Sequence, residues 1–558
     1  MKEDIIKLLK KHTGLKDVQL EIPPNPILGD YAFPCFQLCK KYKLPAHEIA
    51  KNLAKELQQV KGISVIEPNG PYLNFFINKQ DLINTILPEI LTQKSKYGSS
   101  KIGKQQKIII EFSQANTHKA FHVGHLRGTC LGESLARIFE FLDYKVIRAN
   151  YQGDTGAHVA KWLWYYQKYQ KNKTFPKKDV EEYIANIYVN AVKKLTSNPK
   201  LQDEVDKINY NLENNKDTKL TSLWKKTRDL SLKEFEKIYK ELDTKFDVYF
   251  FEREMEQPGK EIVKQLLEKK IAEISDGATI VDLEKYNLGK WVLLRKDGTC
   301  LYSAKDLALA KIKFEKYKVK ESIYVVGAAQ NLHLQQLFKT LELLNFKKPL
   351  YHLSFTEVRL PTGKMSSRTG ENILYSDMKQ ELLREAVIQT KQHNSKLSKK
   401  EIERISKQTS SAAIKYVMLS QASTKPIIFD HKKALEFEGE TGPYLQYTHA
   451  RICSILKKEK PQAVKEFSSL VSLEEQNLIN KLSKFQNVIR KSAKELKVNL
   501  LTIYLFELSK TFNEFYHTCS ILKATEPLKQ ERLALALATK ITLQNGLNLL
   551  AISSPESM

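Results

Sequence analysis

A strand, a helix and a second strand follow one another early in the chain. Residues 108–112 form a short apolar run typical of a β-strand, 125–142 carry apolar residues at helical spacing, and 145–150 have the pattern of another strand. Because two strands joined through one helix pair in parallel, this order predicts a βαβ unit. A second half, with a strand at 322–326 and a helix at 330–344, indicates a doubly wound parallel sheet that is split by an insertion.

The chain is too long for a single hydrophobic core. Its 558 residues exceed the size at which one core stops growing, so several domains are expected. We predict an α/β multidomain protein with four parts: an N-terminal α+β domain at 1–95, a doubly wound, Rossmann-like domain at 104–375, a helical connecting region at 376–433 and an all-α helical bundle at 434–558. The insertion spans about 158–290, with helices as far as 246 and strand-like runs at 248–251 and 278–281.

Two histidines stand at the start of the first predicted helix of the sheet domain, in the run His122-Val123-Gly124-His125. A helix N-terminus offers free N–H groups and the positive end of its dipole, which favour phosphate oxygens. Gly124 would let a ligand approach the backbone, and the imidazoles can donate hydrogen bonds to a phosphate whose charge grows during nucleotidyl transfer. The alternative is a pair of capping or core histidines beside a tight turn.

A second polar segment lies far downstream, at 363–370. It holds Lys364, Met365, Ser366 and Ser367 between glycines that can absorb a change of backbone angle. A lysine and two hydroxyls suit the phosphates of a triphosphate, over which such a loop can close. An ordinary solvated loop has the same composition and remains the alternative.

In this order the two segments resemble the two signatures of class I aminoacyl-tRNA synthetases, and the residues around them resemble those of arginyl-tRNA synthetases. The resemblance runs from Gly29-Asp30-Tyr31-Ala32 to Gly546-Leu547-Asn548-Leu549-Leu550 and therefore covers almost the whole chain. Its most specific stretches are 111–121, leading into the histidine motif, 302–306, 324–327 with Gln330, and 438–447.

The resemblance implies an arginine–tRNA ligase. Such an enzyme activates L-arginine with ATP, accompanied by Mg²⁺, to arginyl-adenylate, and transfers the arginyl group to the 3′-terminal ribose of tRNA(Arg). It also implies that 1–95 contacts tRNA, that 376–433 contacts its stem, and that 434–558 binds the anticodon. Two alternatives stay open: another class I nucleotidyl-transferring synthetase, and a catalytically silent tRNA-binding relative.

The amino-acid substrate can be argued from the chemistry of a guanidinium group. It is a planar fork of five donors that does not deprotonate, so its pocket needs a carboxylate and further acceptors. Asp306 and Glu111 can supply these, and Tyr302 lies one helical turn from Asp306 on the same face. The alternative is local, because Ser303 and Asp306 also fit a helix capping box.

Other roles come only from the resemblance. It assigns Asn116 and Gln330 to the main-chain groups of bound arginine and places Glu111 and Tyr302 with Asp306 in the specificity pocket. Taken alone, Asn116 fits a turn cap and Gln330 the start of an exposed helix.

One position departs from the general class I pattern. Ser367 stands where that loop usually has a second lysine. We expect Lys119 to compensate and to act in catalysis with His122, His125 and Lys364. The alternative for Lys119 is a solvent-facing lysine.

Three residues near the start of the last domain share one helix face: Tyr444, Tyr447 and Arg451. The resemblance places them in the anticodon-binding domain, so contact with tRNA bases or backbone competes with simple core packing. Arg451 is the better candidate for a phosphate. The formal net charge of +26 favours a polyanionic partner, although many of the lysines are expected on solvated helix faces.

The six cysteines have no Cys-x-x-Cys spacing suited to structural zinc, so we expect no zinc site and no other protein-bound metal. The sequence contains no secretory signal and no apolar stretch long enough to span a bilayer, which predicts a cytoplasmic protein without membrane contact. A monomer is the usual state of the family that the chain resembles.

Overall fold

The computed structural model describes residues 2–57, 62–171, 174–359, 361, 373–393 and 397–558. They form two compact units. The first comprises Met1–Tyr97, Ser454–Lys484 and Lys510–Thr542, and the second comprises Gly98–Cys453, Phe485–Ser509 and Leu543–Met558. The predicted phosphate-binding residues Lys364, Met365, Ser366 and Ser367 lie outside the described residues.

Five parallel strands form the main sheet of the second unit, in the order β11-β10-β4-β5-β6. They are β4 (Lys107–Glu111), β5 (Lys145–Gln152), β6 (Val248–Phe251), β10 (Glu321–Gly327) and β11 (Leu350–Phe355). From β4 the chain winds outward through β5 and β6 and then crosses back to β10 and β11 on the other side of β4. The predicted doubly wound order is therefore confirmed, with its switch point between β4 and β10.

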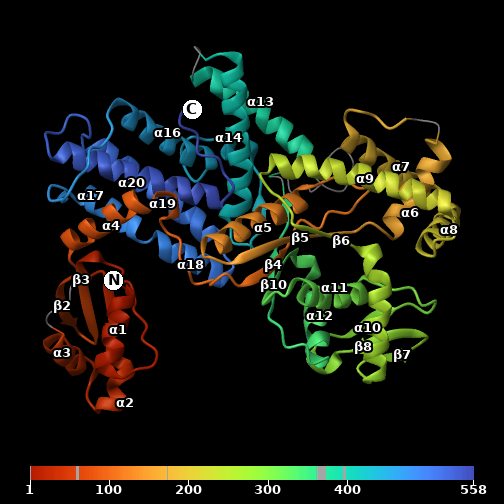
Figure 1. Ribbon diagram of the computed structural model, residues 1–558, viewed down its shortest axis with the longest axis horizontal. Coiled ribbons are helices and arrows are strands. Elements are labelled where there is room, and N and C mark those ends of the chain that lie inside the picture. The colour runs from red at the N-terminus through yellow and green to blue at the C-terminus, as the bar shows by residue number, and fades with distance from the viewer. Residues whose placement is uncertain (1, 58–61, 172–173, 360, 362–372, 394–396) are drawn as a thin grey trace. The chain divides into compact units, whose positions relative to one another are not determined.

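Helices cover both faces of this sheet (Figure 1). Helix α5 (Val123–Phe141) packs on one face, and α11 (Tyr302–Tyr317) and α12 (Asn331–Leu343) pack on the other. Successive strand residues point to opposite faces. In β4, Ile109 packs with Leu309 of α11, so Glu111, two residues further on, faces the same helix. Strand periodicity thus carries an acidic side chain to the α11 side of the sheet.

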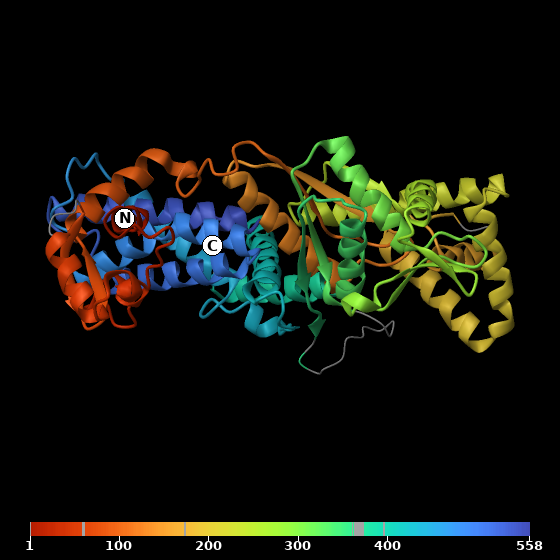
Figure 2. The same ribbon diagram turned by 90° about the horizontal axis from the view of Figure 1, so that it is seen from below.

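The chain between β5 and β6 is helical. It contains α6 (Ala157–Tyr169), α7 (Val180–Ser197), α8 (Gln202–Glu213) and α9 (Thr218–Glu241). Figures 1 and 2 show these four helices grouped at one side of the main sheet. Trp162, Trp224 and Leu212 are among the residues that form their shared core.

The predicted insertion at about 158–290 needs correction, because β6 lies inside this range and pairs with β5 of the main sheet. The insertion is therefore divided into α6–α9 before β6 and a smaller part after it. The later part consists of α10 (Glu256–Glu268) and an antiparallel sheet of β7 (Glu273–Ser275), β8 (Ala278–Asp282) and β9 (Lys290–Leu294). A strand at 248–251 is present as predicted, but strand pattern alone does not say which sheet a strand joins.

The rest of the second unit is mainly helical. It contains the strands β12 (Val358–Arg359) and β13 (Ile427–Ile428), which pair in parallel, and the helices α13 (Tyr375–His393), α14 (Lys399–Ser420), α15 (His431–Ala434), α16 (Gly442–Lys458), α18 (Phe485–Glu495), α19 (Asn499–Thr518) and α20 (Leu528–Leu549). Helices α16, α19 and α20 continue into the first unit. The repeated helices after residue 434 agree with the predicted all-α bundle.

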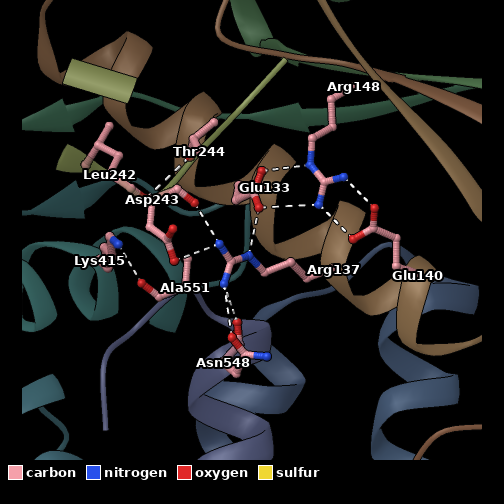
Figure 3. A network of polar contacts seen from close by, with 10 residues as sticks. All are labelled: Glu133, Arg137, Glu140, Arg148, Leu242, Asp243, Thr244, Lys415, Asn548 and Ala551. Atoms are coloured by element: carbon pink, nitrogen blue, oxygen red, sulfur yellow. Dashed lines mark hydrogen bonds and ion pairs between the residues drawn. The ribbon is translucent and has the colours of Figure 1, made fainter. Parts of the chain in front are cut away.

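An ion network within the second unit joins β5, α5 and the end of α20 (Figure 3). Arg148 of β5 contacts Glu133 of α5 at 2.9 Å and also Glu140. Arg137 contacts Glu133 at 2.7 Å and donates to the carbonyl oxygen of Asn548 at 3.0 Å. The side chains of Arg148 and Glu133 are each only 3% exposed, so either charge would destabilise the fold if its partner were removed.

The first unit contains a three-stranded antiparallel sheet, ordered β1-β3-β2. Its elements are α1 (Lys2–Thr13), β1 (Tyr31–Pro34), α2 (Cys39–Tyr42), α3 (Ala46–Glu56), β2 (Ile63–Asn69), β3 (Tyr72–Ile77), α4 (Lys79–Gln93) and α17 (Leu473–Ser483). Phe33, Phe75 and Leu53 belong to its core, which agrees with the predicted α+β fold. Among the described residues of both units, we found no helix that combines the length and the hydrophobicity needed to cross a membrane.

Candidate functional site

A cavity of about 660 Å³ opens at the carboxyl edge of the main sheet. Residues at or just beyond the ends of all five parallel strands line it. Ligands of open parallel sheets bind at this edge, next to the switch point. Eight of the residues predicted from the sequence line this cavity: Glu111, Asn116, His122, Gly124, His125, Tyr302, Asp306 and Gln330.

A larger cavity, of about 1040 Å³, lies beside the ion network of Figure 3. Arg137, Arg148, Glu133 and Glu140 are among its lining residues. Their charges are already engaged with one another, and the predicted site residues do not line it. The smaller cavity is therefore the better candidate for chemistry.

His122 and His125 open α5 and cap it reciprocally. The Nδ1 atom of His122 accepts a hydrogen bond from the N–H of Gly124 at 3.1 Å, and Nδ1 of His125 accepts one from the N–H of His122 at 3.4 Å. The two rings stack with centroids 3.7 Å apart. Because Nδ1 is an acceptor in each ring, a neutral ring carries its proton on Nε2. The capping alternative is thus correct, and it leaves an Nε2–H group on each ring as a donor for a ligand.

Both imidazoles are held in the neutral form. Burial lowers the pKa of His122 to about 4, and the positive charge of Lys119 adds to this effect. Burial, followed by His122 and Lys119, lowers the pKa of His125 well below its ordinary value. At neutral pH the pair therefore offers hydrogen-bond donors to a phosphate and no formal charge.

Gly124 lies against the ring of its neighbour His122. A Cβ atom at this position would lie 2.9 Å from Cε1 of His122. The absence of a side chain therefore makes room for the His122 ring. Gly124 still lines the cavity.

Lys119 is not among the described residues that line the cavity. Its ammonium group lies 4.8 Å from the centroid of the Tyr188 ring on α7. A cation over an aromatic face is stabilised by the charge distribution of the ring. Because its charge also lowers the pKa of both His122 and His125, Lys119 acts on the histidine pair from beside the cavity.

Asp306 presents one free carboxylate oxygen. Its Oδ2 atom lies 2.7 Å from Nε2 of His333, whereas Oδ1 is buried and has no hydrogen-bond partner among the described residues. The capping-box alternative for Asp306 is wrong, because α11 is preceded by Leu301 without a side-chain cap and Ser303 donates instead to the carbonyl oxygen of Val292. An unpaired buried carboxylate oxygen at a cavity is suited to a cationic ligand.

Glu111 enters the cavity from the end of β4. Only 4% of its surface is exposed. Its Oε2 atom forms an ion pair with Nζ of Lys313 at 2.5 Å, and Oε1 accepts a hydrogen bond from Gln114 at 3.4 Å. Glu111 therefore differs from Asp306 in its charge partner, since the negative charge of Glu111 is already matched by a lysine.

Tyr302, Asn116 and Gln330 complete the set of predicted arginine-binding residues. The ring of Tyr302 lies 4.7 Å from that of His333, and Tyr302 is 52% exposed at the cavity. Asn116 forms an isolated β-bridge with Gly153, where a Cβ atom would lie 2.2 Å from Oδ1 of Asn116. Gln330 immediately precedes α12, and its side chain does not cap that helix.

Sequence reasoning missed Glu252, His333, Tyr151 and Lys313. Burial raises the pKa of Glu252 to about 7, and Lys305 opposes this effect while Asp306 and Asp154 add to it. Glu252 directly follows β6, so the carboxyl edge of the sheet was a signal that could have found it. His333 lies three residues after Gln330, where the helix period carries it toward the same cavity.

The predicted tRNA-contacting residues lie on α16. The guanidinium of Arg451 stacks 4.7 Å from the ring centroid of Tyr447 and donates to its hydroxyl at 3.0 Å. Tyr444 packs against Phe506 with centroids 5.6 Å apart. Tyr447 is exposed and Tyr444 is partly buried, so core packing explains Tyr444 better than Tyr447.

Three family descriptions match successive parts of the chain. Residues 86–431 match the sequence model for tRNA synthetases class I (R), catalytic domain. Residues 1–77 match the arginyl tRNA synthetase N terminal domain, and 445–558 match the DALR anticodon binding domain.

Known proteins show the same similarity over the full length. The arginine–tRNA ligase of Clostridioides difficile (strain 630) is 36% identical over 564 residues, which cover 100% of this chain and 98% of that protein. The arginine–tRNA ligase of Clostridium beijerinckii is 37% identical over 569 residues, with complete coverage of both chains. The solved structure of Thermus thermophilus arginyl-tRNA synthetase has 25% identity and a TM-score of 0.84, covering 100% of this chain and 99% of that one.

The chain combines a doubly wound sheet with paired histidines at the start of α5 and carboxylates at the carboxyl edge of the sheet. Its N-terminal, catalytic and C-terminal parts all match one family. The protein belongs to the arginyl-tRNA synthetase family of class I tRNA synthetases.

Proposed function

We propose that the protein is an arginine–tRNA ligase, which joins L-arginine to tRNA(Arg) at the expense of ATP. The observation that carries this proposal is the free Oδ1 atom of Asp306, buried at a cavity that neutral His122 and His125 also line. Joining arginine to a nucleotide requires a carboxylate that binds the guanidinium group and, beside it, hydrogen-bond donors that bind the phosphates. The activity that gives the relatives their names supports the same function.

Arginine recognition would rest on the α11 side of the cavity. Asp306 accepts from the guanidinium through Oδ1, with Tyr302 and Glu111 as further acceptors. Asn116 and Gln330 bind the main-chain groups. A lysine substrate cannot satisfy the same planar set of acceptors, so selectivity follows from buried groups left without partners.

Activation needs positioning more than a protein nucleophile. The arginine carboxylate oxygen attacks the α-phosphorus of ATP in line, a new O–P bond forms, and the bond to the leaving pyrophosphate breaks with its electron pair on the pyrophosphate. The Nε2–H groups of His122 and His125 donate to the phosphate oxygens as their charge grows. The two histidines are proposed to bind ATP together with Gly124, Lys364, Met365, Ser366 and Ser367. Lys119 is proposed to act in catalysis with His122, His125 and Lys364.

Mg²⁺ is proposed to enter with ATP. Among the described residues, no group of three or more His, Cys, Asp or Glu side chains is arranged to hold a metal ion. Mg²⁺ usually keeps several waters and is bound through substrate phosphates, so the triphosphate itself would carry it. Bound in this way, Mg²⁺ would compensate phosphate charge while the two histidines donate to the phosphate oxygens.

Transfer is proposed to use the 2′-hydroxyl of the terminal ribose of tRNA. That oxygen attacks the carbonyl carbon of the adenylate and loses its proton to water, and AMP leaves with the electron pair of the mixed anhydride bond. Tyr444, Tyr447 and Arg451 are proposed to contact the tRNA, with Arg451 at a phosphate. The protein is proposed to act as a monomer in the cytoplasm.

The test is ATP–pyrophosphate exchange with each of the twenty amino acids, in the presence and absence of total tRNA. Exchange that depends on arginine alone is the expected result. Exchange with a different amino acid would identify another class I synthetase. Tight tRNA binding without exchange for any amino acid would identify a catalytically silent relative.

A further inference from the structure

One buried cation lies behind the cavity, and the proposed reaction does not use it. Lys313 of α11 is fully buried and lies two helical turns after Asp306. Residues seven positions apart share a helix face, so Lys313 and Asp306 approach the main sheet from the same side of α11.

The surroundings of Lys313 keep it charged. Its Nζ atom lies 2.5 Å from Oε2 of Glu111 and 4.0 Å from the ring centroid of Tyr324 on β10. Burial by itself would lower the pKa of Lys313, but Glu111 and Tyr324 outweigh it and raise the pKa above the ordinary value. Lys313 is therefore an ammonium group at neutral pH.

The charges around the cavity match one bound guanidinium. Glu111 and Asp306 are two carboxylates, and Lys313 contributes one positive charge. Their sum is one negative charge, which a guanidinium neutralises. Glu252, whose pKa burial raises to about 7, adds part of a further negative charge at neutral pH, and the buried Lys305, which opposes that shift, adds a positive charge beside it.

We propose that Lys313 is a positioning and specificity residue for arginine: it neutralises Glu111 and holds that carboxylate, so that Asp306 is the uncompensated one of these two anions. This inference rests on the proposed function and deepens it. Lys313 acts through Glu111, and it is not a catalytic residue, because it does not line the cavity.

The proposal predicts an unusual pattern in paired variants. In Glu111→Gln, Lys313 loses its partner and places an unmatched positive charge behind the guanidinium pocket. The cavity then has no net charge from these groups, and arginine binding weakens. Removing that lysine as well, in Glu111→Gln with Lys313→Met, returns the cavity to one negative charge.

The experiment measures arginine-dependent exchange with tRNA present for the wild type, Glu111→Gln, and Glu111→Gln/Lys313→Met. We expect Glu111→Gln to raise KM for arginine about 30-fold or more, and the double variant to lower it again about fivefold or more, with KM for ATP changed less than about twofold throughout. Thermal unfolding of each variant establishes that folded protein is being compared.

Lys415 supplies the matched control. It is also buried, but it donates to the carbonyl oxygen of Ala551 and does not line the cavity. Glu111→Gln/Lys415→Met should keep the high KM of Glu111→Gln, because this lysine has no part in the pocket charge.

Three outcomes overturn the role of Lys313 while arginine exchange by the wild type stands. In the first, the KM for arginine of Glu111→Gln/Lys313→Met is no lower than that of Glu111→Gln. In the second, Lys415→Met lowers this KM as much as Lys313→Met does. In the third, Lys313→Met restores the unfolding temperature but not the KM for arginine. If Glu111→Gln does not fold, the double variant is compared with the wild type, and a rise of KM for arginine above about 100-fold rejects the proposal. Absence of arginine exchange in the wild type would instead reject the proposed function, and this inference with it.

Discussion

His333 holds one oxygen of Asp306 and leaves the other available. Its Nε2 atom lies 2.7 Å from Oδ2 of Asp306, while Oδ1 is buried without a partner among the described residues. The His333 ring is itself packed between Trp291 and Tyr302, at centroid distances of 5.5 and 4.7 Å. Helix α12 thus orients a carboxylate of α11 before any ligand arrives, which reduces the entropy lost on binding.

Asp306→Asn should weaken arginine use selectively. The amide keeps the shape of the carboxylate but removes the anion that faces the cavity, so kcat/KM for arginine should fall about 100-fold or more, or about 2.7 kcal/mol. KM for ATP should change little. Steady-state exchange with either substrate varied measures both effects.

Glu315→Gln is the control for that variant, since it removes an acidic group from the exposed side of the same helix. Its arginine kinetics should equal those of the wild type. If Asp306→Asn also behaved like the wild type, Asp306 would have no part in arginine binding.

Arginine binding should strengthen as the pH rises through about 7. Burial raises the pKa of Glu252 to about 7, with Lys305 opposing and Asp306 and Asp154 adding to the shift. Glu252 is therefore neutral at pH 6 and anionic at pH 8, where it attracts a cationic substrate. KM for arginine should fall several-fold over this range, and Glu252→Gln should remove most of the change.

The stability of the same variant checks the assignment. A carboxyl group whose pKa is raised on folding stabilises the folded state only at low pH, and that stability is lost as the pH rises through the folded pKa. At pH 8 the free energy of unfolding of Glu252→Gln, measured with urea, should therefore exceed that of the wild type by about 3 kcal/mol. At pH 4 the two free energies should be nearly equal. An equal gain at both values would contradict a raised pKa.

Lys119→Ala should slow activation. Lys119 is proposed to replace the lysine that the 363–370 loop lacks at Ser367, and its charge reaches the histidine pair. Exchange should fall about 10- to 100-fold at saturating arginine. Lys207→Ala, on an exposed position of α8, should leave the rate unchanged.

Replacing the missing loop lysine gives a sharper result. Ser367→Lys in the Lys119→Ala background should restore much of the lost exchange, because a positive charge is again offered to the triphosphate. No restoration would mean that Lys119 does not substitute for a loop lysine.

Arg148→Met should destabilise the second unit. It removes the guanidinium that Figure 3 shows between Glu133 and Glu140. Because Glu133 keeps Arg137 as a partner and Glu140 is exposed, the loss should be about 1–3 kcal/mol. Urea unfolding measures this loss. Lys168→Met, which breaks the exposed Lys168–Glu204 contact, should hardly move the midpoint, and similar losses in both variants would argue against a special role for burial.

Local apolar periodicity was enough to locate the elements of the main sheet. The strand predicted at 108–112 is Lys107–Glu111, and the helix predicted at 125–142 is Val123–Phe141. Their order along the chain was enough to predict the parallel, doubly wound arrangement, because a strand, helix and strand connect with one handedness. The membership of β6 in the main sheet was not predictable in this way, since strand pairing is a contact between distant segments.

For the site, the sequence alone singled out the motif histidines and Asp306 as candidates, because each residue lies in a local pattern with a chemical meaning, and the structure brings them to one cavity. Spacing alone left Asp306 with two roles of equal standing, a helix cap and a ligand for a cation, and the family resemblance favoured the ligand. Only the tertiary structure ruled out the cap, by starting α11 after Leu301 and packing His333 against one oxygen of Asp306, and the binding of a cation by the other oxygen is a proposal. Glu252, His333 and Lys313 had no such local pattern, because burial and partners brought from other strands and helices give them their charge and position.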